Sequence, residues 1–203
     1  VAIAEDGEIL LRGNNIMRGY WRNPEATKEV MAGDWFKTGD IGSLDEDGFL
    51  TITGRKKELI VTAGGKNVSP AALEDPLRAN PLIGQVVVLG DQMPFVSALV
   101  SLDPEMLSLW LGNNGEDPNL SIAQAAKSPI VHAEIQRAID AVNKKFSKAE
   151  SIRKFIVIDR ELTEDSGHLT PSLKIKREAV MRDYLPLVDD LYASVPMTGG
   201  ERD

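Results

Sequence analysis

The sequence predicts an α+β fold, with short strands in its first part and strands mixed with helices in the rest. Residues 1–53 contain short strand patterns joined by tight Asp and Gly turns, whereas proline-initiated helices alternate with apolar strands after Gly54. Strands and helices mixed in this order are typical of a small α+β domain. A hydrophobic share of 42% in 203 residues is sufficient for a buried core.

The first part is predicted to be rich in strands. Asp6-Gly7 favours a turn before a strand at 8–12, and the acidic turn at 45–48 precedes a strand at 49–53. A short helix is expected at 24–31. Thr38-Gly39-Asp40 has the composition of a tight turn that projects one carboxylate.

In the second part, apolar runs predict strands at 58–62, 85–89, 95–102 and 152–158. Helix starts are indicated by an N-cap residue followed by proline or by a capping box, at Ser69-Pro70, Asp103-Pro104, Ser128-Pro129 and Ser121 with Gln124. Helical spacing of Ile135, Ile139, Val142 and Phe146 predicts a buried helix face. A last helix is expected at 174–184.

We expect three regions: a β-rich part at 1–54, an α+β domain at 55–193 and a disordered tail at 194–203. The net charge of −8 argues against nucleic acid as a partner. No apolar run is long enough for a transmembrane helix, and the chain has no cysteine for disulfides or thiolate metal sites. We expect a cytoplasmic protein, with peripheral membrane contact left open.

Asp40 and Arg55 are the first candidates for a binding site. Asp40 can accept hydrogen bonds from both hydroxyls of a ribose, and Arg55 supplies donors for an adjoining phosphate or ribose oxygen. This pairing predicts a nucleotide as the ligand.

Five segments together resemble the adenylate-forming (ANL) superfamily, which includes acyl-CoA synthetases, luciferases and peptide-synthetase adenylation domains. They lie in family order at residues 19–27, 35–40, 54–60, 64–70 and 169–177. The family's Ser/Thr/Gly-rich phosphate loop and its acyl pocket motifs are not visible in this sequence. The resemblance therefore implies the C-terminal portion of a longer enzyme, which is expected to be inactive alone.

The resemblance also implies roles for individual residues. Lys174 matches the lysine that stabilises the adenylation transition state electrostatically, and Lys57 matches the hinge between the large and small domains. A loop that lines the pantetheine path of CoA corresponds to Gly64, Gly65, Lys66 and Asn67. ATP with Mg²⁺ and CoA are the implied co-substrates, with Mg²⁺ bound mainly by the family's N-terminal domain.

One departure from the family narrows the substrate class. Leu173 stands where many members have glycine before the catalytic lysine, and this form resembles long-chain fatty acid–CoA ligases. A long helical stretch expected at 104–148 also resembles long-chain fatty acid–CoA ligases. The partners implied are a fatty acid, ATP, CoA and the enzyme's own N-terminal domain. A fatty acyl-AMP ligase that donates to a carrier protein and a non-catalytic docking or regulatory module remain alternatives.

His132 and His168 have no cysteine or clustered acidic partner in the sequence. We therefore expect surface or helix-cap histidines and no metal site. Ser43, Ser97 and Ser166 lack the sequence context of a catalytic nucleophile.

Overall fold

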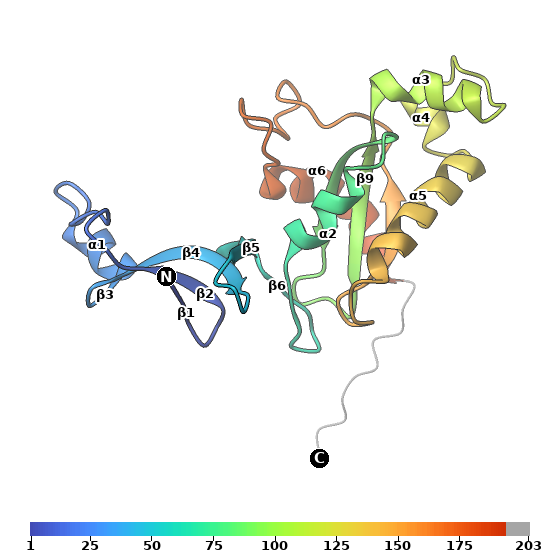
Figure 1. Cartoon of the computed structure of the whole chain (residues 1–203). Coiled ribbons are helices and arrows are strands. Elements are labelled where there is room, and N and C mark those ends of the chain that lie inside the picture. Colours follow the sequence, from blue (N-terminus) through green and yellow to red (C-terminus); the bar gives the residue numbers. More distant parts are fainter. Residues whose placement is uncertain (194–203) are drawn as a thin grey trace. The chain divides into compact units, whose positions relative to one another are not determined.

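The computed structural model describes residues 1–193, so the tail expected to be disordered lies outside the described residues. The chain divides into two compact units, and the division falls between Leu59 and Ile60 (Figure 1). It lies a few residues after the domain boundary expected at Gly54. Whether the functional hinge is at Lys57 stays a prediction.

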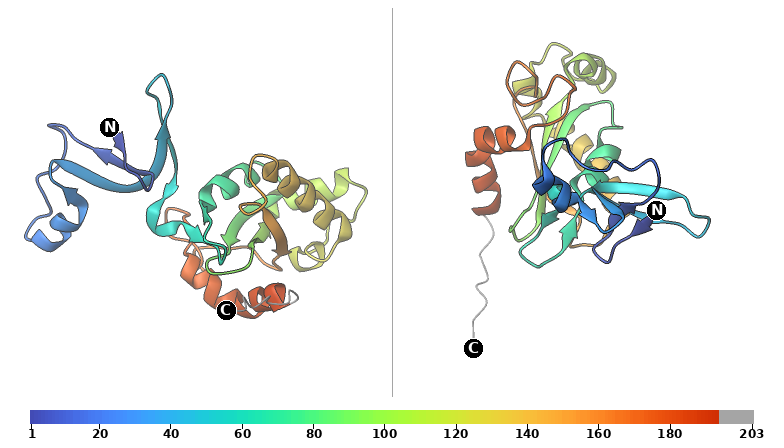
Figure 2. Two further views of the ribbon diagram at one scale, coloured as in Figure 1. Left: turned by 90° about the horizontal axis from the view of Figure 1, so that it is seen from below. Right: turned by 90° about the vertical axis from the view of Figure 1, so that its left-hand side faces the viewer.

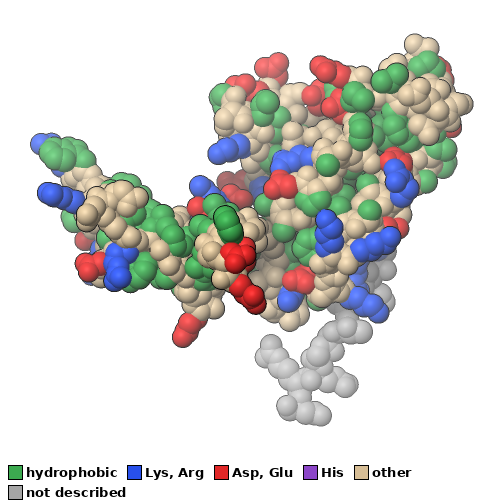
Figure 3. Space-filling view, viewed as in Figure 1, with side chains coloured by type: hydrophobic (Ala, Val, Ile, Leu, Met, Phe, Trp, Pro, Cys, Tyr) green, Lys and Arg blue, Asp and Glu red, His purple; other side chains and the backbone are tan. Residues whose placement is uncertain are grey.

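The first unit is built on an antiparallel sheet. Its strands are β1 (Ala2–Ile3), β2 (Glu8–Leu11), β3 (Met31–Ala32), β4 (Trp35–Leu44) and β5 (Leu50–Arg55), and its one α-helix is α1 (Pro24–Val30). The strand order is β1-β2-β4-β3, and β5 also pairs with β4. Trp21, Phe49 and Ile52 are exposed, so hydrophobic side chains form part of this unit's surface (Figure 3).

The second unit contains a two-stranded hairpin and a three-stranded sheet in the order β10-β9-β8. Its strands are β6 (Ile60–Val61), β7 (Asn67–Val68), β8 (Ile83–Leu89), β9 (Val96–Leu102) and β10 (Ile152–Val157). Its helices are α2 (Pro70–Leu77), α3 (Pro104–Asn113), α4 (Ile122–Ala125), α5 (Pro129–Asn143) and α6 (Arg177–Ala193). Within residues 1–193, no helix is both long and apolar enough to cross a bilayer.

Helices cover both faces of the three-stranded sheet. Val86 and Val88 of β8 pack with α2, α3 and α5, whereas Val87 and Leu89 pack with α6. This alternation follows from the two-residue period of a strand, and Figure 2 shows α6 on the opposite side of the sheet from α2 and α5. The predicted α+β class is confirmed.

Most predicted helix starts are confirmed because their signals are local. Helices α2, α3 and α5 begin at the three predicted prolines, and Ser121 with Gln124 forms the predicted capping box. The predicted face of α5 is buried at Ile135, Ile139 and Val142. The helical stretch expected at 104–148 consists of three separate helices.

One predicted strand and one predicted helix have different bounds in the structure. The strand expected at 58–62 is limited to Ile60–Val61, because its partner β7 is equally short, and Lys56–Glu58 forms a 3₁₀ helix instead. The last helix begins at Arg177 rather than Lys174, because Leu169 pairs with Ile175 and keeps the intervening residues in a hairpin.

Candidate functional site

The first unit brings Asp40 and Arg55 together. They lie opposite each other in the register of β4 and β5, and the Arg55 Nε is 3.3 Å from an Asp40 carboxylate oxygen. The Asp40 side chain is 29% exposed and that of Arg55 is 68% exposed, so a ligand from solvent can reach both. An acceptor and a cationic donor are therefore paired across β4 and β5 and are both accessible from solvent.

The backbone at Asp40 differs from the prediction. Thr38-Gly39-Asp40 is part of the continuous strand β4 and forms an irregularity in its pairing with β2, where Gly39 has φ +75°. The Thr38 hydroxyl donates to the Ile9 carbonyl at 2.8 Å and accepts from the Asp40 N–H at 3.0 Å. Pairing with strands on both sides keeps the segment extended, so a bulge rather than a turn orients Asp40.

Glu8 supports this bulge and was missed by the sequence analysis. Its buried carboxylate accepts from the Gly39 N–H at 3.0 Å and from the Lys56 amine at 2.8 Å. Lys56 also binds Asp6, and this hydrogen bond holds the pKa of the Asp6 carboxyl below its usual range. An acidic residue just after an Asp-Gly turn was the only sequence signal for this role.

A cavity of about 590 Å³ adjoins these residues in the first unit. Its lining side chains include Glu8, Lys37, Arg55, Lys56 and Lys57. Glu29 and Glu58 also line the cavity, so its four cationic side chains face three carboxylates and its charge is nearly balanced. Lys57 itself is exposed and lies in the 3₁₀ helix at the end of this unit.

Residues 62–66, which we call the first lysine loop, connect β6 to β7. The Thr62 N–H donates to the Lys66 carbonyl at 3.0 Å, and the Lys66 N–H donates to the Thr62 hydroxyl at 3.2 Å. Gly65 has φ +76°, which favours glycine, and an added side-chain carbon would meet nothing within 4 Å. At Gly64 the nearest atom to such a carbon is 3.9 Å away. Both glycines therefore border open space.

Asn67 follows this loop as the first residue of β7, where it pairs with Val61. The Lys66 amine lies 3.4 Å from a Glu150 carboxylate oxygen. A hydrogen bond from the Ser147 hydroxyl, with Lys66 as a further contributor, holds the pKa of Glu150 below its usual value. All four residues predicted to line a CoA path thus lie in one exposed stretch of the second unit.

Lys174 lies in residues 170–174, which we call the second lysine loop. Here the Thr170 N–H donates to the Lys174 carbonyl at 2.8 Å, and the Lys174 N–H donates to the Thr170 hydroxyl at 3.1 Å. Leu173 has φ +59° and a side chain that is 67% exposed. Lys174 is exposed, and its amine has no ion-pair partner among residues 1–193. Its positive charge is therefore available to a ligand.

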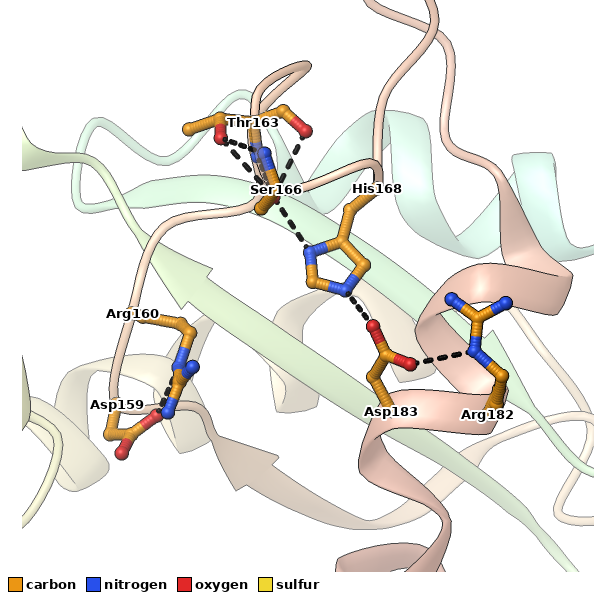
Figure 4. Close-up of polar contacts among 7 residues, drawn as sticks. All are labelled: Asp159, Arg160, Thr163, Ser166, His168, Arg182 and Asp183. Carbon is orange, nitrogen blue, oxygen red and sulfur yellow. Dashed lines mark hydrogen bonds and ion pairs between the residues drawn. The ribbon is translucent and has the colours of Figure 1, made fainter.

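The histidine prediction requires a correction at His168. This side chain is 4% exposed, lies 2.8 Å from the Ser166 hydroxyl through Nδ1 and 3.0 Å from Asp183 through Nε2 (Figure 4). The Ser166 hydroxyl also accepts from the Thr163 N–H at 3.0 Å, so it is held inside its own turn. Asp183 is distant in the sequence, which is why no acidic partner was apparent.

His132 is half-buried, and its Nε2 lies 2.8 Å from the Ala126 carbonyl oxygen. Among the described residues, no group of His, Asp and Glu gathers in a way that could hold a metal ion.

Comparison with known proteins supplies the family. Residues 57–196 match the family described as AMP-binding enzyme C-terminal domain. The chain is 52% identical over 190 residues to the long-chain-fatty-acid–CoA ligase FadD15 of Mycobacterium tuberculosis, covering 94% of this chain and 32% of that protein. It is 36% identical over 217 residues to the long-chain-fatty-acid–CoA ligase ACSBG2 of Gallus gallus, covering 97% and 28%.

A solved structure agrees in fold. The adenylation domain of a carboxylate reductase from Mycobacterium chelonae has a TM-score of 0.70 at 25% identity, covering 92% of this chain and 28% of that chain. The present chain spans about a third of the length of the curated relatives it matches. Its motifs, its two lysine loops and the match from residue 57 onward lead to one assignment: the chain belongs to the adenylate-forming enzymes and contains their AMP-binding enzyme C-terminal domain.

Proposed function

We propose that this chain is the C-terminal region of a long-chain fatty acid–CoA ligase. The observation that carries the proposal is Lys174, an exposed cation on a hydrogen-bonded loop with no ion-pair partner among residues 1–193, in a chain that is 52% identical to a ligase of that class. The whole enzyme would use a fatty acid, ATP and CoA, and would include an N-terminal domain as partner of this region. A cytoplasmic location with peripheral membrane contact stays a prediction.

In the first half-reaction, a fatty acid carboxylate oxygen attacks the α-phosphorus of ATP. The bond between the α-phosphorus and its bridging oxygen to the β-phosphate breaks, so that acyl-AMP forms and pyrophosphate leaves. The Lys174 ammonium would stabilise the negative charge on the α-phosphate oxygens without transferring a proton. Asp40 would accept from the ribose hydroxyls, and Arg55 would donate to an adjoining phosphate or ribose oxygen.

In the second half-reaction, the CoA thiol, as it loses its proton, attacks the acyl carbonyl and AMP leaves. We assign the CoA path to Gly64, Gly65, Lys66 and Asn67, because exposed glycines allow close approach to the backbone. Lys57 would be the hinge at which a few backbone torsions exchange the two lysine loops. Mg²⁺ would enter with ATP, and no residue described here is assigned to it.

The test uses the full-length protein with a panel of fatty acids. We expect fatty acid-dependent exchange of pyrophosphate into ATP, and AMP release that requires CoA. Transfer to a carrier protein in place of CoA would favour an acyl-AMP ligase, and absence of both half-reactions would overturn the proposal. The 203-residue chain alone serves as a control that is expected to be inactive.

A further inference from the structure

Arg177 connects the second lysine loop to the body of the second unit. It is the first residue of α6 and follows Lys174 by three positions. Its Nη2 donates to both carboxylate oxygens of Glu74, at 2.6 and 2.7 Å, and its Nη1 donates to the Val88 carbonyl at 3.1 Å. The two terminal nitrogens of the planar guanidinium thus bind Glu74 and Val88 at once, and this forked contact fixes the direction of the side chain as well as its position.

Glu74 is the buried centre of this contact. It lies in α2, is 4% exposed, and accepts a further hydrogen bond from the Val88 N–H at 2.7 Å. Within residues 1–193, strand β8 is at the edge of its sheet, so the outward N–H and carbonyl of Val88 have no strand partner there. Glu74 and Arg177 supply the missing partners, and their own charges are neutralised in the same contact.

Residues 168–176 form a hairpin around the second lysine loop, and the His168 side of its base is also attached to the unit. The His168 carbonyl accepts from the Lys176 N–H at 2.8 Å, and the His168 side chain is bound to Asp183 of α6 (Figure 4). Leu169 and Ile175 pair between these anchors and the second lysine loop. The base of the hairpin is therefore attached to α2, β8 and α6, while its tip carries Lys174.

We propose that Glu74, acting through Arg177, is a positioning residue for the Lys174 amine, an inference that rests on the proposed function of Lys174. A charge that acts in a transition state must be held within a fraction of an ångström of its place. Hydrogen bonds within the second lysine loop hold the Lys174 backbone, so the point from which the amine extends depends on where the hairpin base is attached. Glu74 determines that attachment without contacting the substrate.

The test compares Arg177→Lys and Glu74→Asp in the full-length protein. Both changes keep the charges. Arg177→Lys loses the forked geometry of the guanidinium, and Glu74→Asp shortens the reach of the carboxylate. We expect the maximal rate of adenylation to fall about 10- to 100-fold with little change in the KM for ATP. Thioester formation from supplied acyl-adenylate should be retained. Arg137→Lys is the matched control, because Arg137 makes a similar paired contact with Glu134 on the surface of α5.

Hydrogen exchange provides a readout that does not depend on catalysis. The N–H groups of Thr170, Leu173 and Lys176, all bonded within the hairpin, should exchange faster in Arg177→Lys than in the control. Unchanged adenylation in both variants, or equal loss of both half-reactions with unchanged hairpin exchange, would overturn the inference. If Lys174→Ala itself retains adenylation, the proposed function fails, and the exchange data still decide whether Glu74 holds the hairpin.

Discussion

The first and second lysine loops are built alike although they lie far apart in the sequence. Each begins with threonine and ends with lysine, and in each the threonine N–H and hydroxyl bind the lysine carbonyl and N–H. Each also has a residue with positive φ directly before the lysine. This pattern fixes the lysine backbone on both sides while its side chain stays exposed.

The two loops differ at the positive-φ residue and in the surroundings of the amine. The first loop has Gly65, whereas the second has Leu173, for which this conformation costs about 1–2 kcal/mol. Lys66 has an ion pair with Glu150, whereas Lys174 has no such partner among residues 1–193. The same backbone device thus serves one lysine that is already paired and one whose charge is free for a transient ligand.

Removing each lysine tests this difference and should give the largest effect. Lys174→Ala in the full-length protein should slow adenylation by about 10² to 10⁴-fold, because this variant loses the charge that we propose to act at the transition state. Lys66→Ala should leave adenylation within about twofold of the parent enzyme. Pyrophosphate exchange measures both variants. Comparable losses of adenylation in Lys174→Ala and Lys66→Ala would show that the two lysines do not have different roles.

The glycine before the positive-φ position offers a second test. Gly64→Ala should slow transfer to CoA about tenfold, equivalent to about 1.4 kcal/mol, if the thiol path runs along this loop. Folding should be unaffected, because φ at Gly64 is not in the left-handed region and an added carbon meets nothing closer than 3.9 Å. Ser172→Ala at the equivalent position of the second lysine loop is the control. An unchanged transfer rate in Gly64→Ala would argue against the CoA path.

Exchanging the residue types at the positive-φ positions should change stability in opposite directions. Leu173→Gly removes backbone strain and loses little packing, because Leu173 is exposed. The greater conformational entropy of glycine in the unfolded chain offsets part of this gain, so the free energy of unfolding should rise by about 0.5 kcal/mol. Gly65→Ala should cost about 1 kcal/mol at its φ of +76°. Denaturant unfolding measures both variants. A loss of stability in Leu173→Gly would mean that the leucine side chain makes a favourable contact.

Glu150 predicts a small pH effect, because hydrogen bonds from Ser147, and to a lesser extent the Lys66 amine, favour its ionised form. The pKa of Glu150 is below its ordinary value of 4.5 in the folded chain, so its stabilising contribution is present above that value and is lost as pH falls through the folded pKa. Because both groups are partly exposed, the contribution should be less than about 1 kcal/mol. The difference in unfolding temperature between parent and Glu150→Gln should therefore vanish on acidification. A difference that persists in acid would contradict this account.

The sequence alone determined the features that depend on neighbouring residues. Proline after an N-cap residue predicted where α2, α3 and α5 begin, and helical spacing predicted the buried face of α5. The motif order also predicted the family now supported by the match at residues 57–196. These signals are local because a cap binds its own first turn, and a helix presents residues three and four apart on one face.

Only the tertiary structure decided the contacts between distant segments. The bulge at Asp40 exists because β2 and β5 pair on either side of β4, and the Glu74–Arg177 contact exists because α2 and α6 both meet the edge of β8. The start of the last helix was mispredicted for the same reason, since the pairing of Leu169 with Ile175 overrode local helix propensity. A buried carboxylate or an edge N–H takes whichever partner the folded chain brings within about 3 Å, and that partner is set by packing rather than by sequence neighbours.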